Sequence, residues 1–419
     1  MSRKLILTVA VCLAAVTAAP AQQAAPPEPP SGISTPDPLN PAQPPPEPAA
    51  ETSAPLLPKP IFSDDCVTRL YDHMQQFKKD WCLPVEIGAW NWEHVNTGGP
   101  NSTGYGIPPN QEGTYFWYLN LDPKADVNWG PITAIGGHAQ LRFREVDKFR
   151  AFYSDQFWSY EAYLWADTPV GRFKAGQIVQ QFGLPGAGDG SFWGTLLYFD
   201  GWNLNPDYGV AWENKWKVRD GFRIDQSAQF FFAEDGINGT VVGSQLESVP
   251  GAHMHSKAVL RLAPTWELAD KSTFVLGLSG LTSEQEHVKA DGRNNWVSAW
   301  AADATYSRKR WQVFGEVLQS YGVLNPMRYA SGGPSERVSD GVLGAQYIWG
   351  PVTFRATASV GFDEDPSGYQ TLFVPGVTVA MTKNIDFYAE YVRWDVYQAL
   401  GNKHTVYEDG IQLVINWRF

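Results

Sequence analysis

Basic side chains recur at every second position in several segments of this 419-residue chain. One such row consists of His138, Gln140, Arg142 and Arg144. Successive side chains of a β-strand point to opposite faces, so these residues share one face, and Ala139, Leu141 and Phe143 share the other. A wall of fixed cations attracts anions and favours polar solutes over apolar ones. The spacing therefore predicts either cations that only solvate a wide polar surface or, where they cluster, a wall that acts on solutes through its charge.

The residues that could support catalysis or hold a metal are poorly placed. None of the seven histidines stands in a suitable arrangement with serine or aspartate on adjacent strand positions. His253 and His255 have a spacing that can bind a transition metal, but they lie in a predicted loop. Asp363 and Asp365 could offer oxygen ligands to Ca²⁺, yet the downstream glutamate of an EF-hand is missing. We therefore expect no enzyme activity, no metal site and no cofactor.

The composition favours a membrane β-barrel. Aromatic residues make up 14% of the chain, with 18 tryptophans, while the mean hydropathy is slightly negative. After the amino terminus no segment approaches 18 consecutive apolar residues, the signal of a membrane-spanning helix. A barrel reconciles these facts, because its polar lumen offsets an apolar outer face. A secreted sugar-binding protein could share this composition, whereas the formal net charge of −12 argues against nucleic-acid binding.

From residue 85 onward the hydrophobic pattern has a period of two. The predicted strand centres lie near residues 90, 117, 138, 161, 174, 213, 227, 260, 277, 301, 315, 344, 356, 377, 390 and 413. This is an even number of strands, sixteen, as in bacterial barrels. The pattern predicts an all-β fold, a transmembrane antiparallel barrel over residues 85–419.

The connections alternate between short and long. Predicted short turns are Arg219 to Gly221, Ser307 to Arg310, Trp349 to Pro351 and Lys383 to Asn384. Predicted long loops are 97–112, 179–207, 233–255, 283–294, 322–338 and 396–405. Outer-membrane barrels have this asymmetry, with short turns at the periplasmic end and long loops outside.

The last strand carries the resemblance to a family. One face holds Ile411, Leu413, Ile415, Trp417 and Phe419; the other holds Gln412, Asn416 and Arg418, with Val414 as an apolar exception. Taken alone, this could be the edge strand of a soluble sandwich. With the loops and the signal peptide, residues 85–419 resemble sixteen-stranded Gram-negative outer-membrane porins. The run from Phe173 to Gln177, followed by Phe182-Gly183-Leu184, is loosely similar to phosphate-selective porins. The chain also loosely resembles carbohydrate-selective porins.

The amino-terminal region has three parts. Arg3 and Lys4, an apolar stretch and Ala19-Pro20-Ala21 make residues 1–21 a predicted secretory signal peptide. Residues 22–60 hold fourteen prolines and are predicted to be a periplasmic linker, with peptidoglycan as a possible partner. Within residues 61–84, the stretch 63–81 is predicted to be an amphipathic helix that packs at the barrel mouth or enters the lumen.

The two cysteines of this helical region, Cys66 and Cys82, raise the question of a disulfide. An intact helix would hold their Cα atoms about 24 Å apart. A disulfide tolerates under about 7 Å. Either the helix is broken or the two cysteines are not paired with each other.

The faces of the strands predict where charges lie. A cation facing lipid near the membrane midplane would cost about 2–4 kcal/mol, so the cationic faces should line the lumen. The resemblance implies that the loop at about 179–207 folds into the barrel and narrows it. Its acids Asp189, Asp200 and Asp207 would then face wall cations. Examples of such wall cations are Arg142, Arg144, Lys174, Lys215 and Arg223.

Two other interpretations of this loop stay open. Trp193, Tyr198 and Trp202 could form a surface on which sugars stack, or the aromatic side chains could simply fix the loop to the wall. The predicted pore-lining residues are Arg142, Arg144, Lys174, Asp189, Trp193, Asp200, Asp207, Lys215, Arg223, Arg261 and Arg355.

The predicted function is passive diffusion of small hydrophilic solutes through a water-filled outer-membrane porin. The alternatives are a porin selective for carbohydrates or anions, and a structural or adhesive barrel. The resemblance implies contact with outer-membrane lipid and lipopolysaccharide, and assembly as a homotrimer.

Overall fold

The computed structural model describes most of the barrel and the helix before it. The described residues are 60–62, 66–96, 114–145, 157–184, 206–233, 254–285, 295–323, 335–363, 368–398 and 403–419. The predicted signal peptide and almost all of the proline-rich segment lie outside them. The elements are α2 (Cys66–Asp80), β1 (Val85–Asn96), β2 (Thr114–Leu121), β3 (Lys124–Trp129), β4 (Ile132–Glu145), β5 (Phe157–Thr168), β6 (Gly171–Ile178), β7 (Asp207–Arg219), β8 (Phe222–Ala233), β9 (Met254–Glu267), β10 (Thr273–Gln285), β11 (Asn295–Arg308), β12 (Trp311–Val323), β13 (Ser335–Trp349), β14 (Val352–Asp363), β15 (Gly368–Ala380), β16 (Ile385–Gln398) and β17 (Lys403–Arg418).

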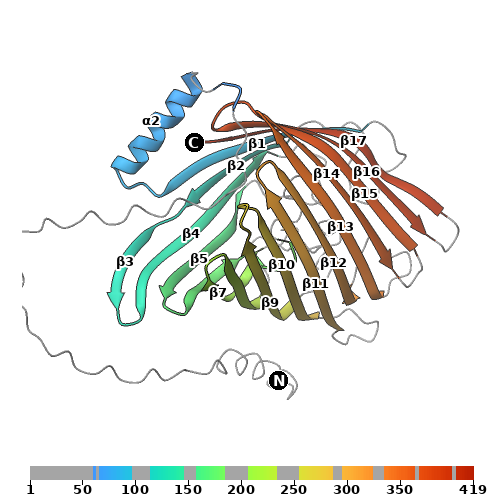
Figure 1. Ribbon diagram of the computed structural model, residues 1–419, viewed down its shortest axis with the longest axis horizontal. Coiled ribbons are helices and arrows are strands. Elements are labelled where there is room, and N and C mark those ends of the chain that lie inside the picture. The colour runs from blue at the N-terminus through green and yellow to red at the C-terminus, as the bar shows by residue number, and fades with distance from the viewer. Residues whose placement is uncertain are drawn as a thin grey trace, which may run out of the picture. The chain divides into compact units, whose positions relative to one another are not determined.

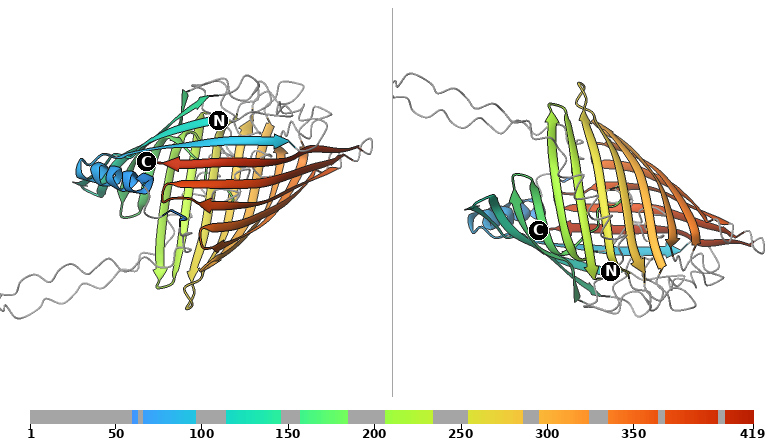
Figure 2. Two further views of the ribbon diagram at one scale, coloured as in Figure 1. Left: turned by 90° about the horizontal axis from the view of Figure 1, so that it is seen from above. Right: turned by 90° about the horizontal axis from the view of Figure 1, so that it is seen from below.

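The strands form one antiparallel sheet that closes on itself as a sixteen-strand barrel (Figures 1 and 2). β2 and β3 count as one crossing, because both pair with β4 along its length. Asp122 and Pro123 interrupt this crossing, and the carbonyl of Pro123 accepts a 3.0 Å hydrogen bond from the Gly137 N–H. Each of the sixteen predicted strand centres falls within a strand, so the predicted fold is confirmed.

The barrel closes where the last strand meets the first. β17 pairs with β1 from Gly88↔Arg418 to Asn96↔Gly410, which brings Trp90 opposite Asn416. On the outer face Trp117 of β2 and Trp417 of β17 meet edge to face, with ring centroids 4.7 Å apart. Ala89, which pairs with both tryptophans, is completely buried. A small side chain at this position lets the two indoles cover the closing seam.

Short turns lie at one end of the barrel. Only Asp220 and Gly221 separate β7 from β8, and Lys309-Arg310 and Gly350-Pro351 likewise connect their strand pairs. Residues with positive φ occur in all three turns, as two-residue hairpins require. Lys383 and Asn384 lie in the four-residue connection 381–384 between β15 and β16, so the four predicted turns are confirmed. At the other end the predicted long loops fall mostly outside the described residues.

The two faces of the strands follow the predicted alternation. On β9, Lys257 and Arg261 are buried toward the lumen, while Leu260 and Leu262 are exposed on the outside. On β14, Thr353, Thr357 and Ser359 are buried and Phe354 is exposed. On β17 the apolar exception Val414 is buried with Gln412 on the inward face.

The outer surface of the barrel is apolar with aromatic residues toward its ends. At the short-turn end four tryptophans are more than half exposed: Trp129, Trp216, Trp311 and Trp349. Between the ends the exposed side chains include Leu164, Leu262, Leu278, Val317, Leu343 and Ile415. Soluble monomers rarely expose a continuous apolar surface of this extent. This belt therefore requires an apolar surrounding, and aromatic girdles flank such a belt in membrane barrels.

Helix α2 packs against the rim at the short-turn end, within the predicted range 63–81 (Figure 1). Lys383, in the turn after β15, forms a 2.8 Å ion pair with Asp72 of the helix. The Tyr71 ring contacts Phe419, which lies on the outer face of β17's end, at a centroid distance of 6.4 Å. The helix is unbroken and Cys66 and Cys82 are free. In the part of the chain that the structure describes, no helix has the length and apolarity needed to cross a membrane.

The terminal phenylalanine connects these parts. Its backbone forms two hydrogen bonds with Ile87, of 2.6 and 2.9 Å, and its ring contacts both Tyr71 and Trp417. We predict that deleting Phe419 lowers the yield of inserted barrels more than it lowers permeation through those that assemble. Heat-modifiable mobility on gels measures insertion, and bilayer conductance measures permeation. The variant Phe419→Tyr, which keeps the ring, serves as the control. Normal assembly of the truncated chain would contradict the prediction.

Candidate pore constriction

The chain segment after β6 enters the lumen and binds the barrel wall. The backbone N–H of Gln181 donates a 2.7 Å hydrogen bond to Oε1 of Gln229 on β8. The amide of Gln229 in turn donates to the carbonyl of Val179 at 3.0 Å. One inward glutamine of β8 thus holds two backbone groups of the segment 179–184.

The segment continues across the wall to β12. The N–H of Gly183 donates to Oγ of Ser279 on β10 at 3.1 Å, and the N–H of Leu184 donates to the carboxylate of Glu316 on β12. Gly183 has φ +70, and a Cβ at this position would lie 2.7 Å from Glu316. The close approach to the carboxylate therefore requires glycine.

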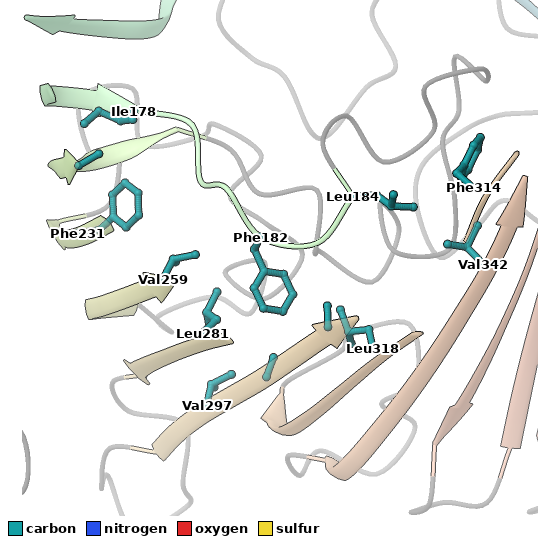
Figure 3. Packing of buried hydrophobic residues seen from close by; sticks show 13 residues of the cluster. Ile178, Phe182, Leu184, Phe231, Val259, Leu281, Val297, Phe314, Leu318 and Val342 are labelled. Carbon is teal, nitrogen blue, oxygen red and sulfur yellow. The ribbon is translucent and has the colours of Figure 1, made fainter. Parts of the chain in front are cut away.

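Apolar side chains fix the same segment to the wall. Phe182 and Leu184, each 7% exposed, pack among inward-facing side chains of β7 to β13 (Figure 3). The other members of this lumen cluster are Ile178, Ala211, Phe231, Val259, Leu281, Val297, Ala299, Ala301, Phe314, Leu318 and Val342. Burial of a side chain the size of Phe or Leu contributes about 1.5–3 kcal/mol. One side of the lumen is thus filled by packed apolar side chains, and the other side is polar.

Sequence reasoning missed this cluster. It expected polar inward faces throughout, but β11 turns Val297, Ala299 and Ala301 inward, opposite the outward-facing Trp296 and Trp300. The first half of β11, where the inward face is also apolar, was the available signal, because only packed protein can cover an apolar inward face in a wet barrel.

Asp207 lies at the start of β7 and forms a buried ion pair. Its carboxylate is 2.6 Å from Nζ of Lys257 and accepts a 2.7 Å hydrogen bond from the Gln180 amide. Side-chain exposure is 5% for the aspartate and 1% for the lysine. Asp207 thus faces a cation of the wall, Lys257, which was not among the examples given for this role. The strand centres gave no register, and register decides which cation is adjacent.

Arg261 is also buried and paired. Its guanidinium binds both carboxylate oxygens of Asp303 on β11, at 2.6 and 2.9 Å, and donates to Ser279 at 2.9 Å. Ser279 therefore connects this bidentate pair to the backbone of Gly183. Arg261 thus holds Ser279, which in turn bonds to the inserted segment.

The other cations of the basic wall are mostly neutralised within the wall. Lys174 pairs with Glu213 at 2.6 Å, and its ammonium lies 4.9 Å from the centre of the Tyr163 ring. Glu213 also accepts a hydrogen bond from the side chain of Gln181. Arg223 lies 3.2 Å from Asp225 of its own strand. Side chains that share a face of neighbouring strands are close enough to pair.

Three cations have environments of a different kind. The Arg142 guanidinium lies 3.2 Å from the centre of the Tyr160 ring and donates to Gln140 at 2.5 Å. Arg355 lies 5.6 Å from the centre of the Tyr388 ring. Lys215 is exposed toward the short-turn end of β7. Among the described residues no ion pair holds Lys215 or Arg355.

His138, the first member of the polar row on β4, is held by two acids. Its Nδ1 lies 2.6 Å from Asp122, and its Nε2 lies 3.4 Å from Glu161 of β5. This position of the polar row on β4 therefore has two carboxylates beside the histidine.

Several predicted features lie beyond the described residues. Asp189, Trp193 and Asp200 are among them, as are Tyr198 and Trp202, and the Arg144 side chain is not described. Their roles stay predictions. His253 and Asp365 are also outside, and within the described ranges no group of three potential ligands could hold a metal ion.

Comparison with known proteins identifies the fold. No family model matches the chain, and no curated protein matches it in sequence. Solved structures do match. The outer membrane channel DcaP of Acinetobacter baumannii is 12% identical with a TM-score of 0.53, covering 80% of this chain and 95% of that one. The outer membrane protein OmpT of Vibrio cholerae in its trimer form is 12% identical with a TM-score of 0.55, covering 80% and 98%. An anion-selective porin from Comamonas acidovorans is 10% identical with a TM-score of 0.50, covering 80% and 97%.

The chain has the porin fold. At identities near a tenth of the residues, these comparisons show the barrel fold alone and do not extend to particular side chains. The inserted segment and its partners must therefore be tested on this chain itself.

We predict that Glu316→Ala loosens the inserted segment of this porin barrel. An intramolecular hydrogen bond contributes about 0.5–1.5 kcal/mol. Its loss should raise the detached population roughly twofold to tenfold and give larger, noisier single-channel currents. Glu316→Gln keeps an acceptor and should restore steady currents. Gln312→Ala, on the same face of β12 but nearer the short turns, is the matched control. An alanine variant with unchanged currents would refute the role of Glu316.

We also predict that Arg261→Met destabilises the barrel because Asp303 is left buried and unpaired. Removing one member of a buried pair costs about 3–5 kcal/mol. Denaturant unfolding in detergent, followed by tryptophan fluorescence, measures the loss. The double variant with Asp303→Leu removes the stranded charge and should recover much of it. Equal stability of the single variant and the native protein would show that water reaches Asp303.

Proposed function

We propose that the chain is an outer-membrane porin that lets small hydrophilic solutes diffuse through a water-filled lumen. The observation that carries this proposal is the closed barrel with an apolar outer belt and a partly polar interior. In lipid every backbone polar group must be paired internally, and a closed barrel meets that requirement. A polar inner face would be costly unless water or polar solutes contacted it. The Gram-negative outer membrane is the location that fits this fold.

We infer that the segment 179–184 begins the constriction. It lies against β7 to β12, so the open part of the lumen faces the remaining wall. That wall presents Arg142 on β4, Lys174 on β6 and Arg355 on β14. Solutes would pass between these side chains and the loop that continues from Leu184. The proposed pore-lining set keeps Asp189, Trp193 and Asp200, which belong to that loop, together with Arg144, Lys215 and Arg223.

Two members of the predicted set have a supporting role in this proposal. Asp207 and Arg261 are nearly inaccessible and paired with Lys257 and Asp303, so they hold the segment and do not contact solutes. Their charges are cancelled locally. The field in the lumen then depends on the cations that lack a carboxylate partner.

Anion preference is the second candidate. It is favoured by Lys215 and Arg355, which have no ion pair among the described residues. The similar Comamonas porin is anion-selective by name. A sugar pathway rests on the aromatic residues of the loop outside the described ranges. We place a structural or adhesive barrel third. A homotrimer is proposed because OmpT, a similar structure, is known in a trimer form. The proposal includes no catalytic role.

The first test is conductance in planar bilayers. We expect purified protein to open ion-conducting pores, and insertion without any current would overturn the porin proposal. Reversal potentials in a salt gradient then measure selectivity. Arg355→Gln and Lys215→Gln should each shift the reversal potential toward cations. Arg69→Gln, an equal charge change on helix α2 outside the lumen, is the control. Cation selectivity of the native protein would exclude the anion version, and current block by oligosaccharides would favour the sugar version.

A further inference from the structure

Helix α2 carries an apolar stripe that nothing in the described structure covers. Leu70, Phe77 and Trp81 are 53%, 55% and 69% exposed. Leu70 and Phe77 share one side of the helix. Trp81 directly follows the last residue of α2 and continues that side, because its N–H donates a 3.0 Å hydrogen bond to the Phe77 carbonyl. The Phe77 and Trp81 rings lie 6.0 Å apart, so the stripe ends in a joined aromatic surface.

The barrel contacts a different side of the helix. Tyr71 reaches Phe419, and Asp72 reaches Lys383, while Thr68 is buried. These contacts fix α2 along the rim, beside the seam between β17 and β1. The apolar stripe therefore takes no part in the contact between the helix and the barrel.

The helix sits at the level where the outer apolar belt ends. Phe419 belongs to the outward face that also holds Trp417 and Ile415, and Ile87, which pairs with Phe419, is 42% exposed on that face. Figure 1 shows α2 beside the chain's carboxyl end, outside the ring of strands. The exposed stripe therefore continues the apolar belt beyond the last strand residue.

Cations accompany the stripe. Lys78 and Lys79 of the helix and Lys124 of β3 line a shallow groove between α2 and the starts of β1 and β3. A helix that lies in a membrane interface typically has leucine, phenylalanine and tryptophan on one side and lysines on another. Lysine ammonium groups at this level can meet lipid phosphates.

We propose that α2 is an interfacial helix that inserts Leu70, Phe77 and Trp81 into the periplasmic phospholipid leaflet around the barrel. The inference rests on the proposed membrane location and adds a lipid-binding element to it. A second copy of the helix is the less favoured occupant, because α2 has 15 residues and a coiled coil needs three to four heptads. Lipid contact would anchor the barrel rim and keep the start of the described chain against the membrane.

Depth-dependent quenching tests this on the full chain. Cys66 and Cys82 are replaced by serine, Phe77→Cys is labelled with an environment-sensitive NBD probe, and the protein is reconstituted in phosphatidylethanolamine and phosphatidylglycerol vesicles. Gln76→Cys, on the exposed polar side, is the matched control. We expect nitroxide-labelled phospholipids to quench the label at residue 77 severalfold more than the label at 76, with a blue-shifted emission.

Three results would overturn the proposal. Equal quenching of both labels by aqueous iodide would mean that the stripe faces water. A blue shift without nitroxide quenching, together with a disulfide between two Phe77→Cys chains, would assign the stripe to a second copy. Equal nitroxide quenching at 76 and 77 would mean that the helix has no fixed side toward lipid. Conductance of the same vesicles is measured in parallel, so that a barrel that never inserted is distinguished from one whose helix does not bind lipid.

Discussion

Closure of the sheet is the constraint on which this structure depends. A membrane offers no partner to a free N–H or carbonyl, so the first and last strands must pair. At the seam between these strands Trp117 and Trp417 pack over Ala89, and a small residue is needed there to leave room for the two rings. The same requirement accounts for the two backbone hydrogen bonds between Phe419 and Ile87. The terminal residue is part of the ladder and of the rim, and helix α2 then rests on its ring.

Once the barrel is closed, its interior must be filled or wetted, and this chain does both. The inward residues of β11 to β13 include Val297, Phe314 and Val342, which water would not stabilise. Phe182 and Leu184 cover them. Hydrogen bonds from the same segment to Gln229, Ser279 and Glu316 satisfy backbone groups that would otherwise be buried without partners. Apolar wall and inserted segment thus depend on each other, and a change to either exposes the other.

The amino-acid sequence was sufficient for the features that depend on period and length. Alternation located all sixteen crossings and the short turns, and the parity of Lys257 and Arg261 placed them inward. It failed where three-dimensional register decides. Asp207 was expected to face wall cations, and it bonds to Lys257, which was not among the five examples, because strand centres do not say which residues stand opposite. Glu316 and Ser279 were not singled out, since a lone acid or serine on an inward face looks like any lumen residue. Their role exists only once the segment 179–184 lies against them.

The arrangement of charge determines how the lumen can act on a solute. A row of cations looked from its sequence like a basic wall, yet Lys174, Arg223, Lys257 and Arg261 each have an acidic neighbour. Paired charges produce a field that decays quickly with distance and contributes little to steering a solute across a wide lumen. Arg355 and Lys215, which have no ion pair within the described ranges, project a longer field from different parts of the wall. The selectivity of this barrel therefore depends less on the number of cations than on which ones the fold leaves without a carboxylate.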